Sequence, residues 1–116
     1  MPHVVLIGDL DAGRVFESLE NIFRKDDRGI LKTGARYFDS EKKSIIIEAT
    51  AIENGPPKNF FVLVSWRNDG LVVRLHPSLD VEKTDGVKMT LALVAKHIMA
   101  TFPGTSVGKT NLQDYL

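Results

Sequence analysis

Four consecutive segments in the middle of the chain have the composition of β-strands and are separated by turn signals. Residues 30–38 alternate in character, and residues 44–53 are rich in β-branched side chains. Residues 60–67 and 71–76 follow, joined at Asn68-Asp69-Gly70, whose Asp-Gly pair suits a tight turn. Because short turns join antiparallel neighbours, these segments predict an antiparallel meander.

The register of the predicted strands follows from which side chains it brings to one face. A three-residue loop at Ser40-Glu41-Lys42 would pair Phe38 with Ser44. The residues of this hairpin that then face the core are Leu31, Thr33, Ala35, Tyr37, Ile45, Ile47, Ala49 and Ala51. Those of the second hairpin are Val62, Val64, Trp66, Val73 and Leu75. A slip of one residue would scatter both sets over the two faces, so the pattern favours this register.

A sheet with one apolar face must be covered, and two amphipathic segments can cover it. Residues 12–25 carry a stripe of apolar side chains at helical spacing, consisting of Val15, Phe16, Leu19, Ile22 and Phe23. Residues 87–102 form a second predicted helix, capped by Thr84 or Asp85 and ended by Pro103-Gly104. Residues 3–10 form a buried strand before the first helix.

The order of these elements predicts the fold class. Strand, helix, four strands and helix indicate an α+β two-layer sandwich, with an antiparallel sheet covered on one face by two helices. This order is similar to the TATA-binding-protein-like (TBP-like) or helix-grip arrangement. The similarity is one of element order alone and implies no function. Residues 1–104 are predicted to form a single domain, and residues 105–116 a polar C-terminal tail with a short apolar end.

Composition excludes several classes of protein. The chain has 15 Lys and Arg against 15 Asp and Glu, and it has no cysteine. Zero net charge argues against binding to nucleic acid or anionic membrane by bulk attraction. The absence of cysteine excludes disulfides, thiol nucleophiles and zinc ribbons. The apolar runs are too short for a signal peptide or a membrane span, so we expect a cytoplasmic protein with no membrane partner.

The face of the predicted sheet that points away from the helices combines cationic and apolar side chains. We take as candidate ligand-binding residues Lys32, Arg36, Phe38, Phe61, Arg67, Arg74 and His76. Only Glu48 opposes their charge on this face, so the hypothesis is an anionic small ligand or, as a weaker reading, nucleic acid. The alternative is a solvated face on which cationic stems lie over apolar neighbours.

The second predicted helix is apolar on two sides. Its core stripe consists of Leu91, Val94, Ala95, Ile98 and Phe102. Met89 and Leu93 lie roughly opposite this stripe. We expect these two residues to form a partner interface, most simply in a homodimer. The alternative is that loops or the C-terminal tail cover them.

Three motifs suggest chemistry but lack the required context. Residues 104–110 resemble a phosphate-binding loop, but three residues rather than four separate the glycines and no strand precedes them. Asp9 and Asp11 are explained as helix caps. The three histidines are far apart in sequence. We therefore expect no metal, no cofactor and no catalytic residue.

These observations favour a non-enzymatic binding or interaction domain that acts as a homodimer through the outer sheet face or the second helix. One alternative is a small-ligand-binding protein or enzyme with a pocket between the sheet and the second helix. Another is nucleic-acid binding through the basic and aromatic face. A pocket of several hundred cubic ångströms with buried polar groups would favour the first alternative.

Overall fold

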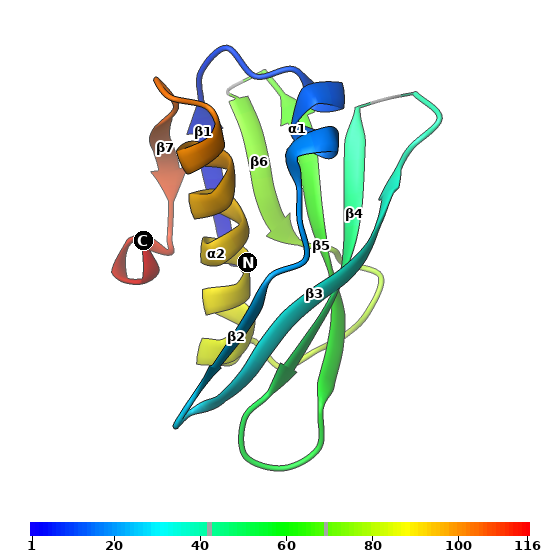
Figure 1. The fold of residues 1–116 in the computed structure, drawn as a ribbon, viewed down its shortest axis with the longest axis vertical. Helices are drawn as coiled ribbons and strands as arrows, with labels where there is room; N and C mark the ends of the chain where they lie inside the picture. Colours follow the sequence, from blue (N-terminus) through cyan, green and yellow to red (C-terminus); the bar gives the residue numbers. More distant parts are fainter. Residues whose placement is uncertain (42, 69) are drawn as a thin grey trace.

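The strands predicted in the middle of the chain all form, and two edge strands join them. The structure is a computed structural model that describes residues 1–41, 43–68 and 70–116. Over these residues the fold is α+β, with two helices and a seven-stranded antiparallel sheet in the order β2-β3-β4-β5-β6-β1-β7 (Figure 1). The elements are β1 (His3–Ile7), α1 (Ala12–Ser18), β2 (Phe23–Asp26), β3 (Gly29–Phe38), β4 (Ser44–Ile52), β5 (Lys58–Arg67), β6 (Gly70–Leu75), α2 (Asp85–Thr101), β7 (Ser106–Thr110) and the 3-10 turn η1 (Gln113–Tyr115).

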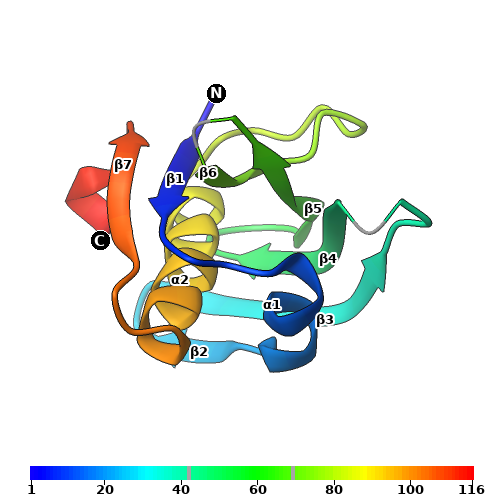
Figure 2. The same cartoon turned by 90° about the horizontal axis from the view of Figure 1, so that it is seen from above.

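The long helix α2 lies on the concave side of the curled sheet (Figure 2). It contacts β1, β3, β4 and β6, while α1 contacts α2 and β4. The predicted cap is confirmed, because the Thr84 hydroxyl accepts a hydrogen bond from the backbone N–H of Val87. Four of the five residues of the predicted core stripe, Leu91, Val94, Ala95 and Ile98, are fully buried, and Phe102 is half-buried against the core. Burial of this stripe against several strands fixes the start of α2 next to the end of β4.

The predicted core faces of β4, β5 and β6 are confirmed. Ile45, Ile47, Ala49 and Ala51 are buried on β4. The pairs Val62–Leu75, Val64–Val73 and Trp66–Leu71 join β5 to β6 and bring the predicted residues to one face, where Trp66 is half-buried. Arg67 pairs with Gly70, so Gly70 belongs to β6 and not to the predicted Asp69-Gly70 turn. The predicted turn at Asp69 and the loop that includes Lys42 fall on positions outside the described residues.

The hairpin of β3 and β4 departs from the predicted register at a β-bulge between Thr33 and Arg36. The bulge lets Phe38 pair with Ile45, so the predicted pairing with Ser44 is wrong. One extra residue reverses the alternation of side chains, because a strand repeats every two residues. Tyr37 is therefore 53% exposed and Ala35 is exposed, whereas both were expected in the core.

Arg36 and Phe38 move to the other side of the sheet for the same reason. The Phe38 ring stacks on Phe16 of α1, with ring centroids 5.0 Å apart. The Arg36 guanidinium donates a hydrogen bond of 2.6 Å to Asn21 Oδ1. Their predicted place on the outer face is wrong.

The helix predicted over residues 12–25 is wrong in its second half. α1 ends at Ser18, and Phe23–Asp26 form β2 instead. The Ile22 N–H donates a hydrogen bond to the Thr33 hydroxyl, and the Thr33 N–H donates one to the Ile22 carbonyl. These two bonds start the pairing of β2 with β3. Gly29 allows the return turn, because its φ is +143° and a Cβ there would collide with the carbonyl oxygen of Ile52. Pairing of residues 23–26 with the edge of β3 therefore outweighs the helical spacing of the apolar residues in the local sequence.

The residues predicted as a polar tail pack onto the rest of the chain. Ser106–Thr110 form β7, which pairs with β1 at the edge of the sheet. Leu112 is buried in the core, and Tyr115 and Leu116 pack against it. η1 also contacts α2, and the Tyr115 hydroxyl donates a hydrogen bond to Asp85 at the start of that helix.

Candidate functional site

Five of the seven predicted ligand-binding residues lie on the outer face of the sheet. These are Lys32, Phe61, Arg67, Arg74 and His76, which alternate along their strands with residues that face the core. They do not form one site. Arg67 and Arg74 line a shared hollow, while Phe61 and His76 contact each other edge to face and Lys32 lies on β3.

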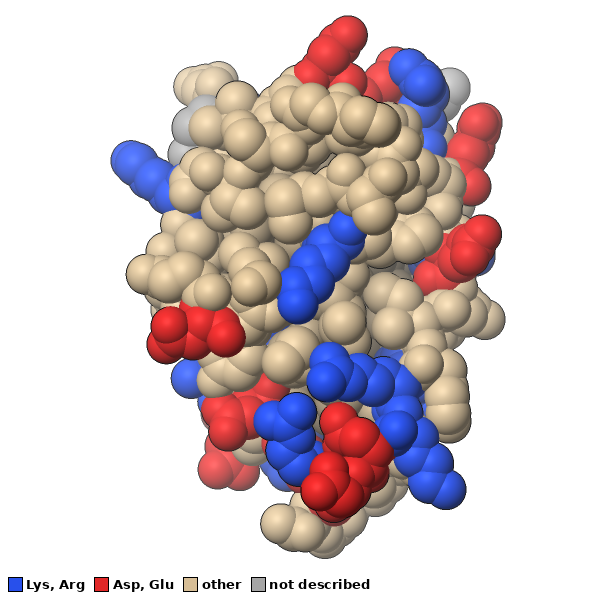
Figure 3. Space-filling model, turned by 60° about the vertical axis from the view of Figure 1, so that its left-hand side comes forward, with Lys and Arg blue, Asp and Glu red and all other residues tan. Residues whose placement is uncertain are grey.

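A larger pocket than this hollow lies elsewhere, between the sheet and the start of α2. It has a volume of about 570 Å³. Its walls are the β2–β3 hairpin, the end of β4, the first turns of α2 and η1, and the lining residues are Arg24, Asp26, Asp27, Arg28, Gly29, Ile30, Leu31, Ile52, Glu53, Asn54, Asp85, Gly86, Met89, Asp114 and Tyr115. We call this the hairpin pocket. In Figure 3, acidic and basic side chains gather at the lower end of the molecule, where Figure 1 shows the hairpin turn and the start of α2.

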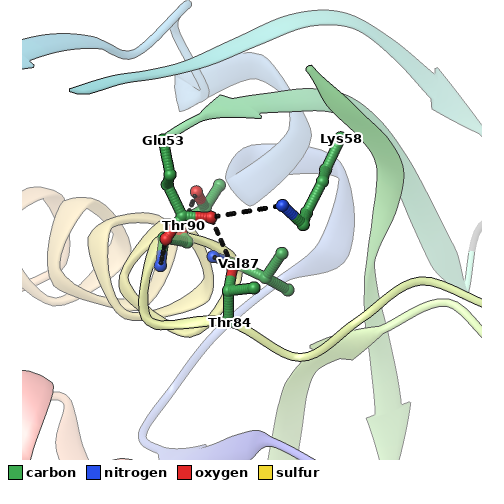
Figure 4. A network of polar contacts seen from close by, with 6 residues as sticks. Glu53, Lys58, Thr84, Val87 and Thr90 are labelled. Carbon is green, nitrogen blue, oxygen red and sulfur yellow. Dashed lines mark hydrogen bonds and ion pairs between the residues drawn. The ribbon is translucent and has the colours of Figure 1, made fainter. Parts of the chain in front are cut away.

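Glu53, just after β4, ties the inner wall of the hairpin pocket together (Figure 4). Its carboxylate accepts hydrogen bonds from the Thr84 hydroxyl at 2.6 Å and from the Gly86 N–H at 2.8 Å. The Lys58 ammonium lies 4.0 Å from the same carboxylate. A Cβ at Gly86 would lie 2.7 Å from Glu53 Cδ, so only glycine allows this approach. Glu53 thus holds the start of α2 against the end of β4, and it also supplies negative charge near the positive end of the helix.

The outer wall of the hairpin pocket carries both positive and negative side chains. Asp26 lies 3.6 Å from the Arg24 guanidinium and 3.8 Å from that of Arg28. Asp27, Asp85 and Asp114 complete the acidic lining. Among the described residues, none of these three aspartates has a Lys or Arg group within ion-pair distance.

Tyr115 reports the electrostatics of the hairpin pocket. Its hydroxyl donates a hydrogen bond of 2.6 Å to Asp85 Oδ1. This hydrogen bond raises the pKa of Tyr115 above its ordinary value, and burial and the charges of Asp85 and Asp114 raise it further. The lining therefore disfavours a negative charge at the Tyr115 oxygen.

Apolar side chains complete the lining of the hairpin pocket. Ile30, Leu31 and Ile52 come from the hairpin and β4, and Met89 comes from α2. Met89 and Leu93, the predicted partner interface, are both half-buried. Met89 thus has a place in the hairpin pocket, whereas nothing in the structure tests its role in a dimer.

The motifs that suggested metal or nucleotide chemistry have structural explanations. Asp11 caps α1 and accepts a hydrogen bond from the Arg14 N–H. Residues 106–110 are a strand that follows a helix, the reverse of a phosphate-binding loop. Among the described residues, no group of three His, Asp or Glu side chains could hold a metal ion.

A bilayer-spanning helix is also missing from the described part of the chain, where no helix is both long and apolar enough.

Sequence reasoning missed most of the residues that line the hairpin pocket. The alternative prediction of a pocket between the sheet and the second helix named no residues. A hairpin signal was present in Asp26-Asp27-Arg28-Gly29, because a glycine after a polar turn often marks a return strand. It was outweighed by the helical spacing of the apolar residues before it.

No known protein family, curated protein or solved structure shows significant similarity to this chain.

Proposed function

We propose that this protein binds a small ligand in the hairpin pocket, and that the ligand is an organic cation with an apolar body. One observation carries the proposal: a pocket of about 570 Å³ lies between the sheet and α2, with five carboxylates and two guanidinium groups in its lining. Small-molecule pockets typically measure ~300–1,000 Å³ and combine apolar walls with a few charged groups.

The charges that remain after internal pairing favour a cation. Asp26 is paired with two arginines, and Glu53 lies near Lys58. Asp27, Asp85 and Asp114 are left to act on a ligand. The acids that raise the pKa of Tyr115 by disfavouring a phenolate would stabilise an ammonium group at the same place.

The apolar lining supports a ligand with a hydrocarbon part. Ile30, Leu31, Ile52 and Met89 provide a surface on which an alkyl or aromatic group can leave water. Methionine adapts to ligands of different shape because its side chain is unbranched and polarisable. An ion without a hydrocarbon part would use only one side of this pocket.

The proposal is tested with three probes that share one alkyl chain and differ in charge. Hexylamine, hexanol and hexanoate are titrated into ¹⁵N-labelled protein and followed by amide chemical shifts. We expect saturable shifts around Gly29, Gly86 and Tyr115 with hexylamine, weaker ones with hexanol and none with hexanoate. Equal binding of all three probes, or tightest binding of hexanoate, would contradict the proposal.

A matched pair of variants separates the pocket from bulk charge. The double variant Asp85→Asn with Asp114→Asn removes two of the three acids without a cationic partner. We expect it to weaken hexylamine binding by about tenfold. The control Asp80→Asn with Glu82→Gln also removes two exposed acids, both outside the pocket lining, and should leave binding unchanged. The same loss in both variants would indicate a general effect of net charge.

The finer architectural prediction is part of this proposal. A TBP-like or helix-grip arrangement is supported by the long C-terminal helix on the concave side of the antiparallel sheet. A homodimer through Met89 and Leu93 stays a prediction. Sedimentation at tens of micromolar protein, with and without hexylamine, would separate it from ligand binding at Met89.

A further inference from the structure

A second concentration of charge lies on the outer face of the sheet, away from α2. Four adjacent strands each contribute one basic side chain to it: Arg67 from β5, Arg74 from β6, His3 from β1 and Lys109 from β7. They line a hollow of about 240 Å³ together with Met1, Val5 and Val72. We call this set of four basic residues the basic cluster. His3 pairs directly with Arg74, and Val5 with Val72, so the sheet itself fixes the spacing.

Arg74 is the least satisfied member of the basic cluster. Its side chain is half-buried, and its Nε is fully buried without a hydrogen-bond partner among the described residues. Its Nη1 donates only to the Met1 sulfur at 3.6 Å, and sulfur is a weak acceptor. Burial, and then the nearby Arg67 charge, lower the pKa of Arg74. A buried donor without an acceptor is unfavourable, so the described part of the chain leaves this guanidinium incompletely satisfied.

Acidic side chains of the described residues do not neutralise the basic cluster. The lining of the hollow includes no carboxylate, and the ion pairs found among the described residues all lie around the hairpin pocket. On the same outer face, Glu48 accepts a hydrogen bond of 2.6 Å from the Tyr37 hydroxyl. That contact engages the nearest acid of β4 away from the cluster.

The rim of the hollow is held in place before any ligand arrives. Asn111 Oδ1 accepts a hydrogen bond from the His3 N–H, and the Asn111 side-chain amide donates to the Met1 carbonyl. The Thr110 hydroxyl donates to the His3 carbonyl at 2.7 Å. These contacts join β1 to β7 and so fix Lys109 relative to Arg74. Such preorganisation reduces the entropy that binding must overcome.

We propose that the basic cluster binds the phosphate group of a small phosphorylated molecule. A guanidinium presents its N–H donors in a planar fork that fits phosphate oxygens, and a lysine adds a point charge. This site is separate from the hairpin pocket and does not depend on it.

The observations favour a small phosphorylated molecule over a nucleic acid strand. The cations converge on one hollow, whereas a strand requires a stripe of charge with aromatic platforms. Phe38 is turned to the helix side, and Phe61 is engaged edge to face with His76. Zero net charge also gives no bulk attraction for a polyanion.

The test uses pyrophosphate as the probe, with calorimetry and NMR of the full chain. We expect saturable binding that moves the Arg74 Nε–H resonance and the amides of Val72 and Lys109. Arg67→Gln and Lys109→Gln, both exposed positions that should fold normally, should each weaken binding by about tenfold. Lys32→Gln removes a cation from the same face outside the hollow and should leave binding unchanged. Arg74→Lys keeps the charge but removes the Nε–H donor, so it should also weaken binding.

Three results would overturn the proposal. One is the absence of saturable pyrophosphate binding to the unmodified chain. Another is equal binding by the Arg67, Lys109 and Lys32 variants, which would show that only net charge matters. The third is tighter binding of an oligothymidylate than of pyrophosphate at equal phosphate concentration, reduced as much by Lys32→Gln as by Arg67→Gln. That result would replace the small ligand with an extended nucleic acid surface.

Discussion

Glu53 and Arg74 are both half-buried charged residues, and the fold treats them in opposite ways. The Glu53 carboxylate accepts hydrogen bonds from Thr84 and Gly86 and lies near Lys58. The Arg74 guanidinium lies beside a like charge, and its Nε has no partner among the described residues. The charge of Glu53 is thus accounted for by the structure of the chain, whereas that of Arg74 is not.

This difference shows which charged residues to assign to ligands. A buried polar group with internal partners stabilises the fold and needs no ligand to explain it. A buried group without them points to something that the chain itself does not provide. By this criterion, Glu53 is a structural wall of the hairpin pocket. Asp27, Asp85 and Asp114 are exposed and have no Lys or Arg within ion-pair distance among the described residues, so they are the acids of the lining that would meet a cation.

The largest expected effect follows from removing Glu53. Glu53→Ala leaves the Gly86 N–H, the Thr84 hydroxyl and Lys58 without their acceptor, so we expect the free energy of unfolding to fall by about 2 kcal/mol. Urea denaturation measures it. Glu48→Ala is the control from β4, the strand that precedes Glu53. Among the described residues the exposed Glu48 bonds only the exposed Tyr37, so this variant should change stability little. Equal losses would contradict the structural role of Glu53.

The next effect distinguishes two phenylalanines that the sequence placed on one face. Phe38 stacks on Phe16, so Phe38→Ala should remove about 2 kcal/mol of stability and loosen α1. Phe61 lies on the outer face against His76, so Phe61→Ala should cost less. Hydrogen exchange of α1 amides provides the check: faster exchange is expected in the Phe38 variant alone. Similar exchange in both variants would argue against the bulge that separates the two rings.

The smallest effect concerns the two tyrosines, each hydrogen-bonded to an acid. The bond to Asp85 raises the pKa of Tyr115, so the contact contributes stability below pH ~10 and loses it as the pH rises through the raised pKa. In a Tyr37→Phe background Tyr115 is the only tyrosine of the sequence, so the absorbance of the phenolate reports its titration alone. We expect Asp85→Asn to lower its midpoint and Asp80→Asn to leave it in place. If the titration midpoint of Tyr115 does not change in Asp85→Asn, Tyr115 no longer supports an acidic pocket.

The sequence predicted the parts of the fold that are set by long-range burial. The core stripe of α2 and the core faces of β4, β5 and β6 have strong periodic patterns, and the structure buries most of their residues. The Thr84 cap follows from a single residue type before the helix and is confirmed. These patterns are reliable because a slip of register would expose many apolar side chains at once.

The missed parts are decided by single positions or by strand edges. The bulge at Gly34 and Ala35 inserts one extra residue into β3 and has no repeating sequence pattern that would predict it. It nevertheless turns Arg36 and Phe38 to the other face of the sheet. β2 and β7 are short strands that form because they pair with the open edges of β3 and β1. The residues of β2 and β7 alone carry no information about those edges. The hairpin pocket depends on β2, and the basic cluster on Lys109 of β7, so neither site could be assembled from spacing alone.

One measurement tests the central claim that charges without internal partners mark two separate ligand sites of opposite preference. Hexylamine and pyrophosphate are titrated in turn into the same ¹⁵N-labelled sample, in both orders. The account predicts two disjoint sets of shifted resonances, one including Gly29 and Tyr115 and the other including Val72 and the Arg74 Nε–H. Shifts of one common set, or hexylamine binding that is confined to the outer face, would contradict it.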